Sequence, residues 1–298
     1  MIVLNMSIKI VDFFYWRILA FLFSISLTIA AAIGYFEIGL NLGIDFTGGI
    51  ITEIKLSNPA LGNGVKESLE KKYKNISIQI SNTDVLLRFQ NSEHISDNIE
   101  IDNVKADILK VDNKAQILKL DVVGPKISSD LMNKSIWAFF WALLMVMIYV
   151  FIRFDWKFSI AAILSLCHDV FASIGFFIFT GYEFNLTSIA AILTIIGYSV
   201  NDSVVIFDRI RENQKKLSSK ITPKLINKSI NETLSRTMMT FLTTFVACIA
   251  LWIFGGDSLR SFSAAITFGI AFGTYSSIFI SANVLPYMND RHQKNKSF

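Results

Sequence analysis

Long apolar runs alternate with charged segments along this chain of 298 residues. An α-helix needs about 17 to 25 mainly apolar residues to cross the hydrocarbon core of a bilayer. Six runs reach that length and predict membrane-spanning helices at Ile18–Phe36, Ile136–Ile152, Phe158–Phe179, Leu186–Phe207, Met238–Phe254 and Phe262–Leu285. The pattern therefore indicates an integral membrane α-helical bundle of six transmembrane helices.

One domain-sized polar segment, residues 37–134, separates the first span from the second. Its pattern predicts strands at Ile50–Leu56, Ile76–Ile80, Val85–Phe89 and Ala115–Val123, and helices at Val65–Tyr73 and Ile99–Leu109. The order βαββαβ is that of an α+β, ferredoxin-like domain, a fold with many unrelated functions. We therefore expect three parts: a tail and first span in residues 1–36, this domain in residues 37–134, and a five-helix transmembrane domain with cytoplasmic loops and a C-terminal tail in residues 135–298.

The distribution of basic residues predicts the orientation, because short cytoplasmic loops hold an excess of Lys and Arg. Such residues gather in both tails and in the second-to-third and fourth-to-fifth connections: Lys9, Arg17, Arg153, Lys157, Arg209, Arg211, Lys215, Lys216, Lys220, Lys224, Lys228, Arg291, Lys294 and Lys296. The turn Thr180–Asn185 has none. Both termini are therefore expected in the cytoplasm and the α+β domain on the outer side. The net charge of +4 reflects this topology, so no nucleic-acid partner is expected.

The first span has a second interpretation as a secretory signal peptide, because Ala30–Ala32 supplies small residues suited to cleavage. Its apolar run continues to Phe36, which is too long for a typical signal sequence. An uncleaved anchor is the favoured interpretation.

The composition is that of a membrane protein and argues against several other classes of protein. Hydrophobic residues make up 52% of the chain, and both cysteines, Cys167 and Cys248, fall inside predicted spans. Neither suits a disulfide or a zinc site. The soluble segments have no nucleophile arrangement and no phosphate-binding glycine loop, so we expect no enzyme activity, cofactor or metal.

Asp202 is the main candidate for chemistry, since a carboxylate in a membrane span costs several kcal/mol unless it faces water or a partner. It follows Asn201, and Arg236 lies at the cytoplasmic start of the next span, at a similar depth. Low dielectric favours the neutral acid and a guanidinium favours the carboxylate, so the group could bind and release a proton. The alternatives are a packing contact of Asp202 with Ser199 and Ser203, and a lipid-facing anchor role for Arg236.

Two further sets of residues are candidates in the spans. His168 and Asp169 lie near the middle of the third span, where they could relay protons or could form a satisfied structural pair. Gly269 and Gly273 place small residues on one face of the sixth span, which allows close helix packing within the chain or against a partner.

The segment Gly43–Gly49 follows the first span directly and contains Gly43, Asp45, Gly48 and Gly49. Its glycines permit positive φ angles and close backbone approach, which predicts a tight junction between membrane and domain. An ordinary glycine-rich turn is the alternative.

These motifs resemble the SecD/SecF family of protein-export membrane subunits, part of the resistance-nodulation-division superfamily. The glycine segment is similar to the family's signature after the first membrane helix. Four other segments are similar to SecF members: Leu193–Asp202, Asp208–Glu212, Leu234–Thr237 and His168–Val170. The resemblance covers the whole chain in order, although a second, SecD-like half is absent.

The resemblance implies an auxiliary subunit of the bacterial Sec translocase that couples the proton motive force to preprotein export. It implies an inner-membrane location with a periplasmic domain, and as partners a SecD-like subunit, a SecYEG-type channel, the translocating preprotein and membrane lipids. Two alternatives remain: a proton-driven small-molecule or lipid exporter, and a translocase scaffold that transports nothing.

Overall fold

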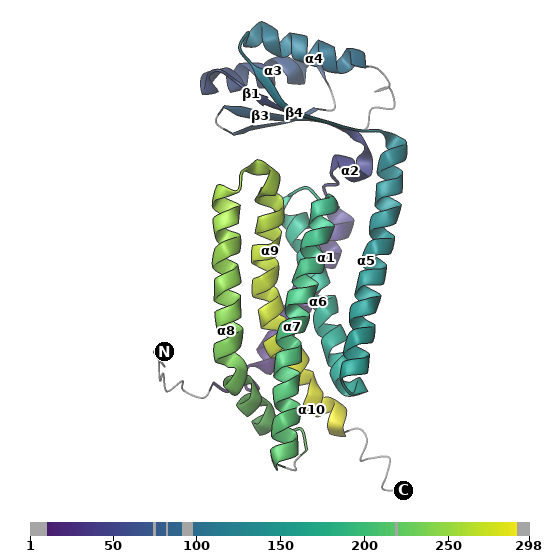
Figure 1. Ribbon diagram of the computed structural model, residues 1–298, viewed down its shortest axis with the longest axis vertical. Coiled ribbons are helices and arrows are strands. Elements are labelled where there is room, and N and C mark those ends of the chain that lie inside the picture. The colour runs from purple at the N-terminus through teal and green to yellow at the C-terminus, as the bar shows by residue number, and fades with distance from the viewer. Residues whose placement is uncertain (1–10, 74–75, 82, 91–97, 218–219, 291–298) are drawn as a thin grey trace. The chain divides into compact units, whose positions relative to one another are not determined.

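The computed structural model describes residues 11–73, 76–81, 83–90, 98–217 and 220–290 (Figure 1). The described chain divides into two compact units. One contains the residues up to Asn41 and from Phe139 onward, and the other is Leu42–Ala138.

The prediction of six membrane-length apolar helices is confirmed. The helices are α1 (Arg17–Glu37), α5 (Pro125–Arg153), α6 (Trp156–Thr180), α7 (Leu186–Leu217), α8 (Pro223–Phe254) and a last span formed by α9 (Asp257–Ser276), η2 (Ser277–Ser281) and α10 (Ala282–Asp290). The chain is therefore a multi-pass membrane protein.

Helix α9 lies at the centre of the bundle, where it packs against α6, α7 and α8 (Figure 1). In the most apolar stretch of the last span, 72% of the residues are buried, whereas only 6% are buried in the corresponding stretch of α8. The core includes Phe158, Phe177 and Phe207, all fully buried. The outward side chains of α8 are mainly apolar, as lipid contact requires.

Helices α7 and α8 are longer than their apolar runs predict. Helix α7 continues to Leu217, and α8 begins at Pro223 after Thr222, whose side chain accepts a hydrogen bond from the Leu225 amide. These extensions pack through buried Ile210 and Ile226. Their polar residues follow a helical period rather than a loop pattern, so a search for continuous apolar runs excludes them.

The N-terminal segment is hydrogen-bonded to the start of α8 through two asparagines that lie one helical turn apart. The amide of Val11 donates to Asn231 Oδ1 at 3.0 Å, and Asn231 Nδ2 donates to the Val11 carbonyl at 2.9 Å. The amide of Phe14 donates to Asn227 Oδ1 at 2.9 Å. Side chains of α8 thus replace the backbone partners that an irregular segment lacks.

The second unit is a four-stranded antiparallel sheet with helices α3 (Gly62–Lys72) and α4 (Asn98–Val111) on one side (Figure 1). Its strands, β1 (Gly49–Lys55), β2 (Ile76–Ser81), β3 (Asp84–Gln90) and β4 (Gln116–Val123), lie in the order β2-β3-β1-β4. Two short helices, α2 (Ile44–Thr47) and η1 (Pro59–Leu61), flank β1. The predicted order of strands and helices is confirmed, and α2 was not predicted.

The core of this unit forms where alternate strand residues meet the two helices. Ile54 of β1 and Leu87 of β3 are buried against Leu69 of α3 and Ile108 of α4. In β1, Ile51 pairs with Arg88 on one side and Asp121 on the other. The period of two along each strand therefore separates a core face from a more polar face.

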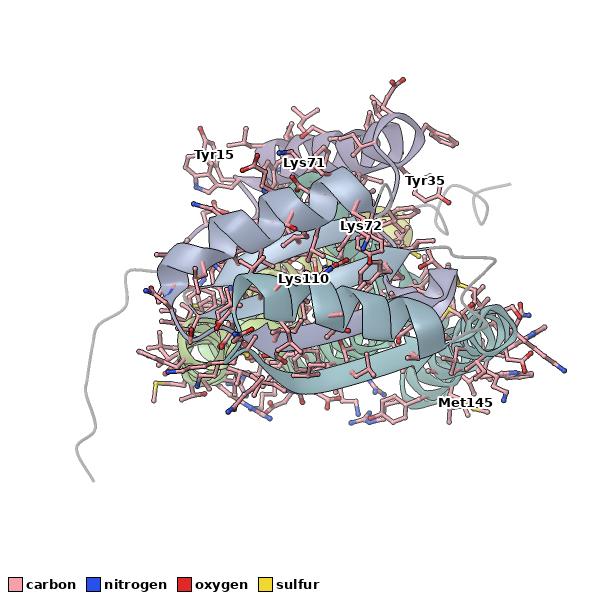
Figure 2. The ribbon with its side chains drawn as sticks, turned by 90° about the horizontal axis from the view of Figure 1, so that it is seen from above. Tyr15, Tyr35, Lys71, Lys72, Lys110 and Met145 are labelled. Carbon is pink, nitrogen blue, oxygen red and sulfur yellow. The ribbon has the colours of Figure 1, made fainter. Side chains whose placement is uncertain are left out.

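Asp107 joins α4 to the end of α3. Its carboxylate accepts hydrogen bonds from Lys72, from Lys110 Nζ at 2.9 Å and from the Tyr73 hydroxyl at 3.2 Å. Figure 2 shows both lysines on these two helices. The lysine hydrogen bonds, that of Lys72 foremost, lower the pKa of Asp107 from its ordinary value of 3.8 to about 2.

We expect this ion cluster to make the stability of the α+β unit depend on acid pH. A pKa lowered in the folded state stabilises the fold above the unfolded value of 3.8, and that stabilisation is lost as the pH falls through about 2. Asp107→Asn should remove this dependence, measured as the unfolding temperature of the full chain in detergent between about pH 5 and 2. Glu70→Gln, which alters an exposed pair with Lys66, is the control. An unchanged pH dependence in Asp107→Asn would contradict the assignment.

Candidate functional site

Asp202 lies on the face of α7 that packs against α9, and only 2% of the residue is exposed. Oxygen Oδ2 accepts a hydrogen bond from the Thr274 hydroxyl of α9 at 3.3 Å. A threonine hydroxyl can serve either the neutral acid or the carboxylate, because it both donates and accepts. The carboxyl is thus enclosed by protein and contacts a partner that suits both protonation states.

Asn201 and Arg236 do not join Asp202 in a contact pair. Asn201 is exposed, because neighbouring residues on a helix point about 100° apart. The side chain of Arg236 is also exposed, and within the described residues no ion pair joins it to Asp202. Its guanidinium attracts the carboxyl from a longer distance. The expected close approach of the two groups is absent in this conformation.

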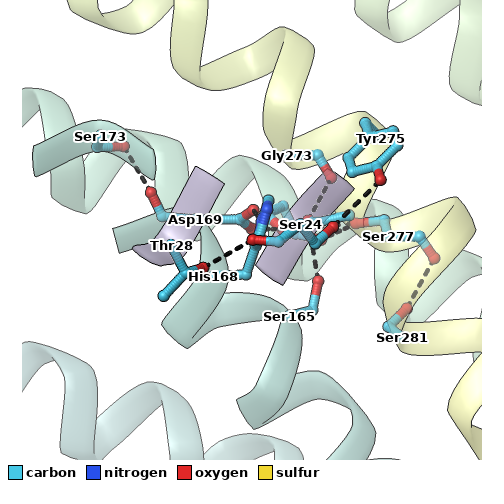
Figure 3. Close-up of polar contacts among 12 residues, drawn as sticks. Ser24, Thr28, Ser165, His168, Asp169, Ser173, Gly273, Tyr275, Ser277 and Ser281 are labelled. Carbon is cyan, nitrogen blue, oxygen red and sulfur yellow. Dashed lines mark hydrogen bonds and ion pairs between the residues drawn. The ribbon is translucent and has the colours of Figure 1, made fainter. Parts of the chain in front are cut away.

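Hydroxyl groups from α7 and η2 form a buried chain that includes Ser203, the residue after Asp202. Figure 3 shows Ser277 and Ser281 of this chain. The Ser203 hydroxyl donates to Ser277 Oγ at 3.1 Å and lies 3.4 Å from Ser281 Oγ. Ser277 Oγ donates to the Ser199 carbonyl at 3.0 Å, and these four serines are at most 2% exposed. Residues 277–281 form a π-helical turn, a feature frequent at functional sites.

His168 and Asp169 adjoin this chain from α6 (Figure 3). Imidazole Nδ1 lies 3.2 Å from Asp169 Oδ1, and the Ser199 hydroxyl donates to Asp169 Oδ2 at 2.5 Å. The two residues are 6% and 1% exposed. The structure therefore brings two predicted candidates, His168 and Asp169, into one polar cluster with the helix that carries Asp202.

Sequence reasoning missed the contribution of the last span. Thr274, Ser276, Ser277 and Ser281 are buried and face α6 or α7. Their recurrence within an apolar run is the signal that could have identified them, because hydroxyl-rich faces of transmembrane helices pack against other polar helices. Among the described residues, no group of three His, Cys, Asp or Glu side chains is placed to hold a metal ion.

Gly269 and Gly273 bring α9 close to α7 within this chain. A Cβ atom at Gly269 would overlap with Ile195 Cδ1, and one at Gly273 would lie 3.3 Å from Ser199 Cβ. Ile195 is itself 1% exposed and has little room to move. The small residues therefore set the helix separation on which the contact between Thr274 and Asp202 depends.

We expect Gly269→Ala to destabilise the transmembrane unit by about 1–3 kcal/mol, the usual cost of overpacking a filled interior. Reversible unfolding in mixed detergent would measure the change. Gly197→Ala is the matched control, because nothing lies within 4 Å of a Cβ atom at that position of α7. Equal stabilities of the two variants would argue against close α7–α9 packing.

The glycine segment forms a helix and a turn that lead into β1. Gly43 precedes α2, Asp45 lies in its first turn, and Gly48 ends it with φ 74°. Gly49 begins β1 with φ 141°. Such φ values favour glycine strongly, which explains two of the three glycines in the motif.

Comparisons with known proteins agree with this arrangement. The family model "Protein export membrane protein SecD/SecF, C-terminal" matches residues 103–291, and the model "SecD/SecF GG Motif" matches residues 36–60. The protein translocase subunit SecF of Rickettsia akari is 42% identical over 96% of this chain and 94% of its own length. SecF of Rickettsia prowazekii is 41% identical over 96% of this chain and 93% of its own length.

Solved structures extend the likeness to three dimensions. The crystal structure of SecDF from Thermus thermophilus, described as a translocon-associated membrane protein, has a TM-score of 0.83 and 36% identity over 96% of this chain. A second SecDF structure, in a super-membrane-facing form, has a TM-score of 0.63 and 34% identity over 95%. The chain spans 40% of the length of each solved chain.

Proposed function

Because this chain belongs to the SecD/SecF family of protein-export membrane proteins, we propose that it is a SecF-type auxiliary subunit that couples the proton motive force to preprotein export. Its role is mechanical and ion-conducting, without an enzyme reaction of its own. The observation that carries the coupling is Asp202, a carboxyl 2% exposed inside a membrane-spanning helix. Carboxyl groups so placed mark ion and proton pathways in membrane proteins.

The proposed partners follow from the relatives. This chain matches the solved SecDF chain over 40% of its length, and a SecD-like subunit is the first proposed partner. A SecYEG-type channel and the emerging preprotein complete the assembly. The apolar outer faces of α1, α5 and α8 suit lipid or a neighbouring membrane subunit.

The proposed location is the bacterial inner membrane, with both termini in the cytoplasm and a ferredoxin-like domain in the periplasm. The strand order β2-β3-β1-β4 and its two covering helices support the ferredoxin-like assignment. Basic residues at the joined ends of α5 and α6 and of α7 and α8 support the orientation. Lys9 and the basic residues of the C-terminal tail lie outside the described residues.

In the proposed cycle, Asp202 takes up a proton from one side of the membrane and releases it to the other. Movement of α8 would bring Arg236 toward the carboxyl and favour its ionised form, and retreat would favour the neutral form. Asn201, exposed on the adjacent face of α7, would meet water or the partner subunit. Glycines 43, 48 and 49 would transmit the helix movement to the outer domain.

Affinity purification of the tagged full chain from native membranes tests the assignment. The expected result is co-isolation of a SecD-like chain, with a protein-conducting channel retained after mild cross-linking. The Asp202→Asn chain should co-isolate both in equal amounts, because Asp202 lies inside the bundle. Isolation with an outer-membrane or drug-efflux component instead would favour an exporter.

A further inference from the structure

The His168–Asp169 pair on α6 differs from a satisfied structural pair in one respect. Both residues are more than nine-tenths buried, and Asp169 has hydrogen-bond partners for both oxygens. Imidazole Nε2 of His168, in contrast, is buried and has no hydrogen-bond partner within the described residues. Buried polar atoms are nearly always paired, and each exception calls for an explanation.

The geometry of the pair suits proton binding at that nitrogen. When Nδ1 carries the hydrogen and donates it to Asp169 Oδ1, the lone pair of Nε2 is free to accept a proton. The imidazolium formed in this way is stabilised by the adjacent carboxylate, and loss of the proton from Nε2 restores the starting state. The N–H bond forms as an O–H bond of a hydronium ion breaks, and the reverse occurs on release, so the step is balanced with water as the proton donor and acceptor.

The surroundings of the pair contain few other charges. From α7 it faces Ser199, and Asp202 lies three residues further along that helix; from the last span it faces Ser276 and Tyr275, whose ring centroid lies 6.1 Å from that of His168. From α1, Ser24 reaches the Tyr275 hydroxyl at 3.1 Å. Within the described residues no Lys or Arg side chain is in ion-pair contact with Asp169. Asp202 is the next acid group along α7 from Ser199.

Ser199 connects the pair to Asp202. Its hydroxyl donates to Asp169, and its Cβ lies about 5–6 Å from that of Asp202 because the two residues are three apart on α7. Charges interact more strongly in a protein interior than in water, so a positive charge there disfavours a second bound proton nearby. A proton on His168 would thus favour proton release from Asp202.

We propose that His168 and Asp169 form a second proton-binding site, linked through Ser199 to Asp202. The inference rests on the proposed function and deepens it: a proton that arrives at the pair helps to expel the proton held by Asp202. Two protons then occupy the membrane unit in turn, and hydrogen bonds join Ser199, which contacts the pair, through Ser277 to Ser203, the residue after Asp202.

Proton counting on the full chain in lipid nanodiscs tests the proposal. The protein is acidified in weak buffer, and uptake is followed with a pH indicator. Asp202→Asn should take up about one proton fewer than the parent, and Asp202→Asn combined with His168→Gln about two fewer. The matched control adds Ser159→Ala, which alters a buried hydroxyl of α6 far from the pair and should cost no proton. Equal uptake by the Asp202→Asn chain with and without His168→Gln overturns the proposal.

A second measurement needs no change at His168. The chain has three histidines, and nitrogen resonances of labelled imidazoles can be assigned with His94→Gln and His292→Gln. The Nε2 resonance of His168 should move from the acceptor to the protonated position on acidification, and a resonance that never moves overturns the proposal. Failure of the export assignment would appear separately, as gradient-stimulated export that survives Asp202→Asn.

Discussion

Asp202→Asn is expected to abolish the stimulation of preprotein export by a proton gradient while ATP-driven export continues. Asparagine keeps the shape of the side chain and can still accept the hydrogen bond from Thr274, but it cannot bind and release a proton. The measurement is export into inverted membrane vesicles with ATP, with and without an uncoupler. The parent should respond to the uncoupler, and the variant should not.

The control for this result is Thr194→Val on the same helix. Thr194 is exposed and its hydroxyl bonds the Ala190 carbonyl of its own helix, so its loss should leave gradient stimulation intact. Both variants must reach normal membrane levels and retain the SecD-like partner. Full stimulation in Asp202→Asn would assign this carboxyl to helix packing and would favour the scaffold interpretation.

Gly49→Ala is expected to destabilise the α+β unit by about 3 kcal/mol, the upper end of the range for a strained backbone position. The residue has φ 141°, and an added Cβ atom would overlap with the Phe89 carbonyl oxygen of β3. That oxygen belongs to the backbone of the sheet and cannot move as a side chain can. Amide hydrogen exchange of the full chain should show faster exchange throughout β1 and β3.

Gly64→Ala is the matched glycine replacement in the same unit. A Cβ atom there would meet only Val111 Cγ1, at 3.8 Å, an ordinary contact. Because alanine is favoured over glycine within a helix, the change in α3 should be neutral or stabilise by up to about 1 kcal/mol. If both variants exchange as slowly as the parent, Gly49 is not a conformational requirement and the segment is an ordinary turn.

The sequence predicts the helices and strands more accurately than it predicts the contacts between them. Apolar length locates α6 almost to its ends, and alternation locates β1 and β3, because both signals are local. The apolar pattern does not predict the extensions of α7 and α8, because the burial of each extension depends on the presence of the other. Asp202 could be identified from the sequence because a carboxyl group is costly in lipid. The exposed position of Arg236 and the contact of Asp169 with Ser199 depend on helix packing, which spacing along the chain does not encode.

The π-helical turn at Ser277–Ser281 holds one residue more than a regular helical turn does. Deletion of a single residue there would let an ordinary helix form. The residues beyond the deletion would keep their orientation, because the wide turn had already absorbed the extra residue. Leu285 would stay enclosed in the bundle, and Tyr287 would keep the hydrogen bond that it accepts from Arg17. Related chains that are one residue shorter in this stretch should therefore keep the same interior residues and lack only the wide turn.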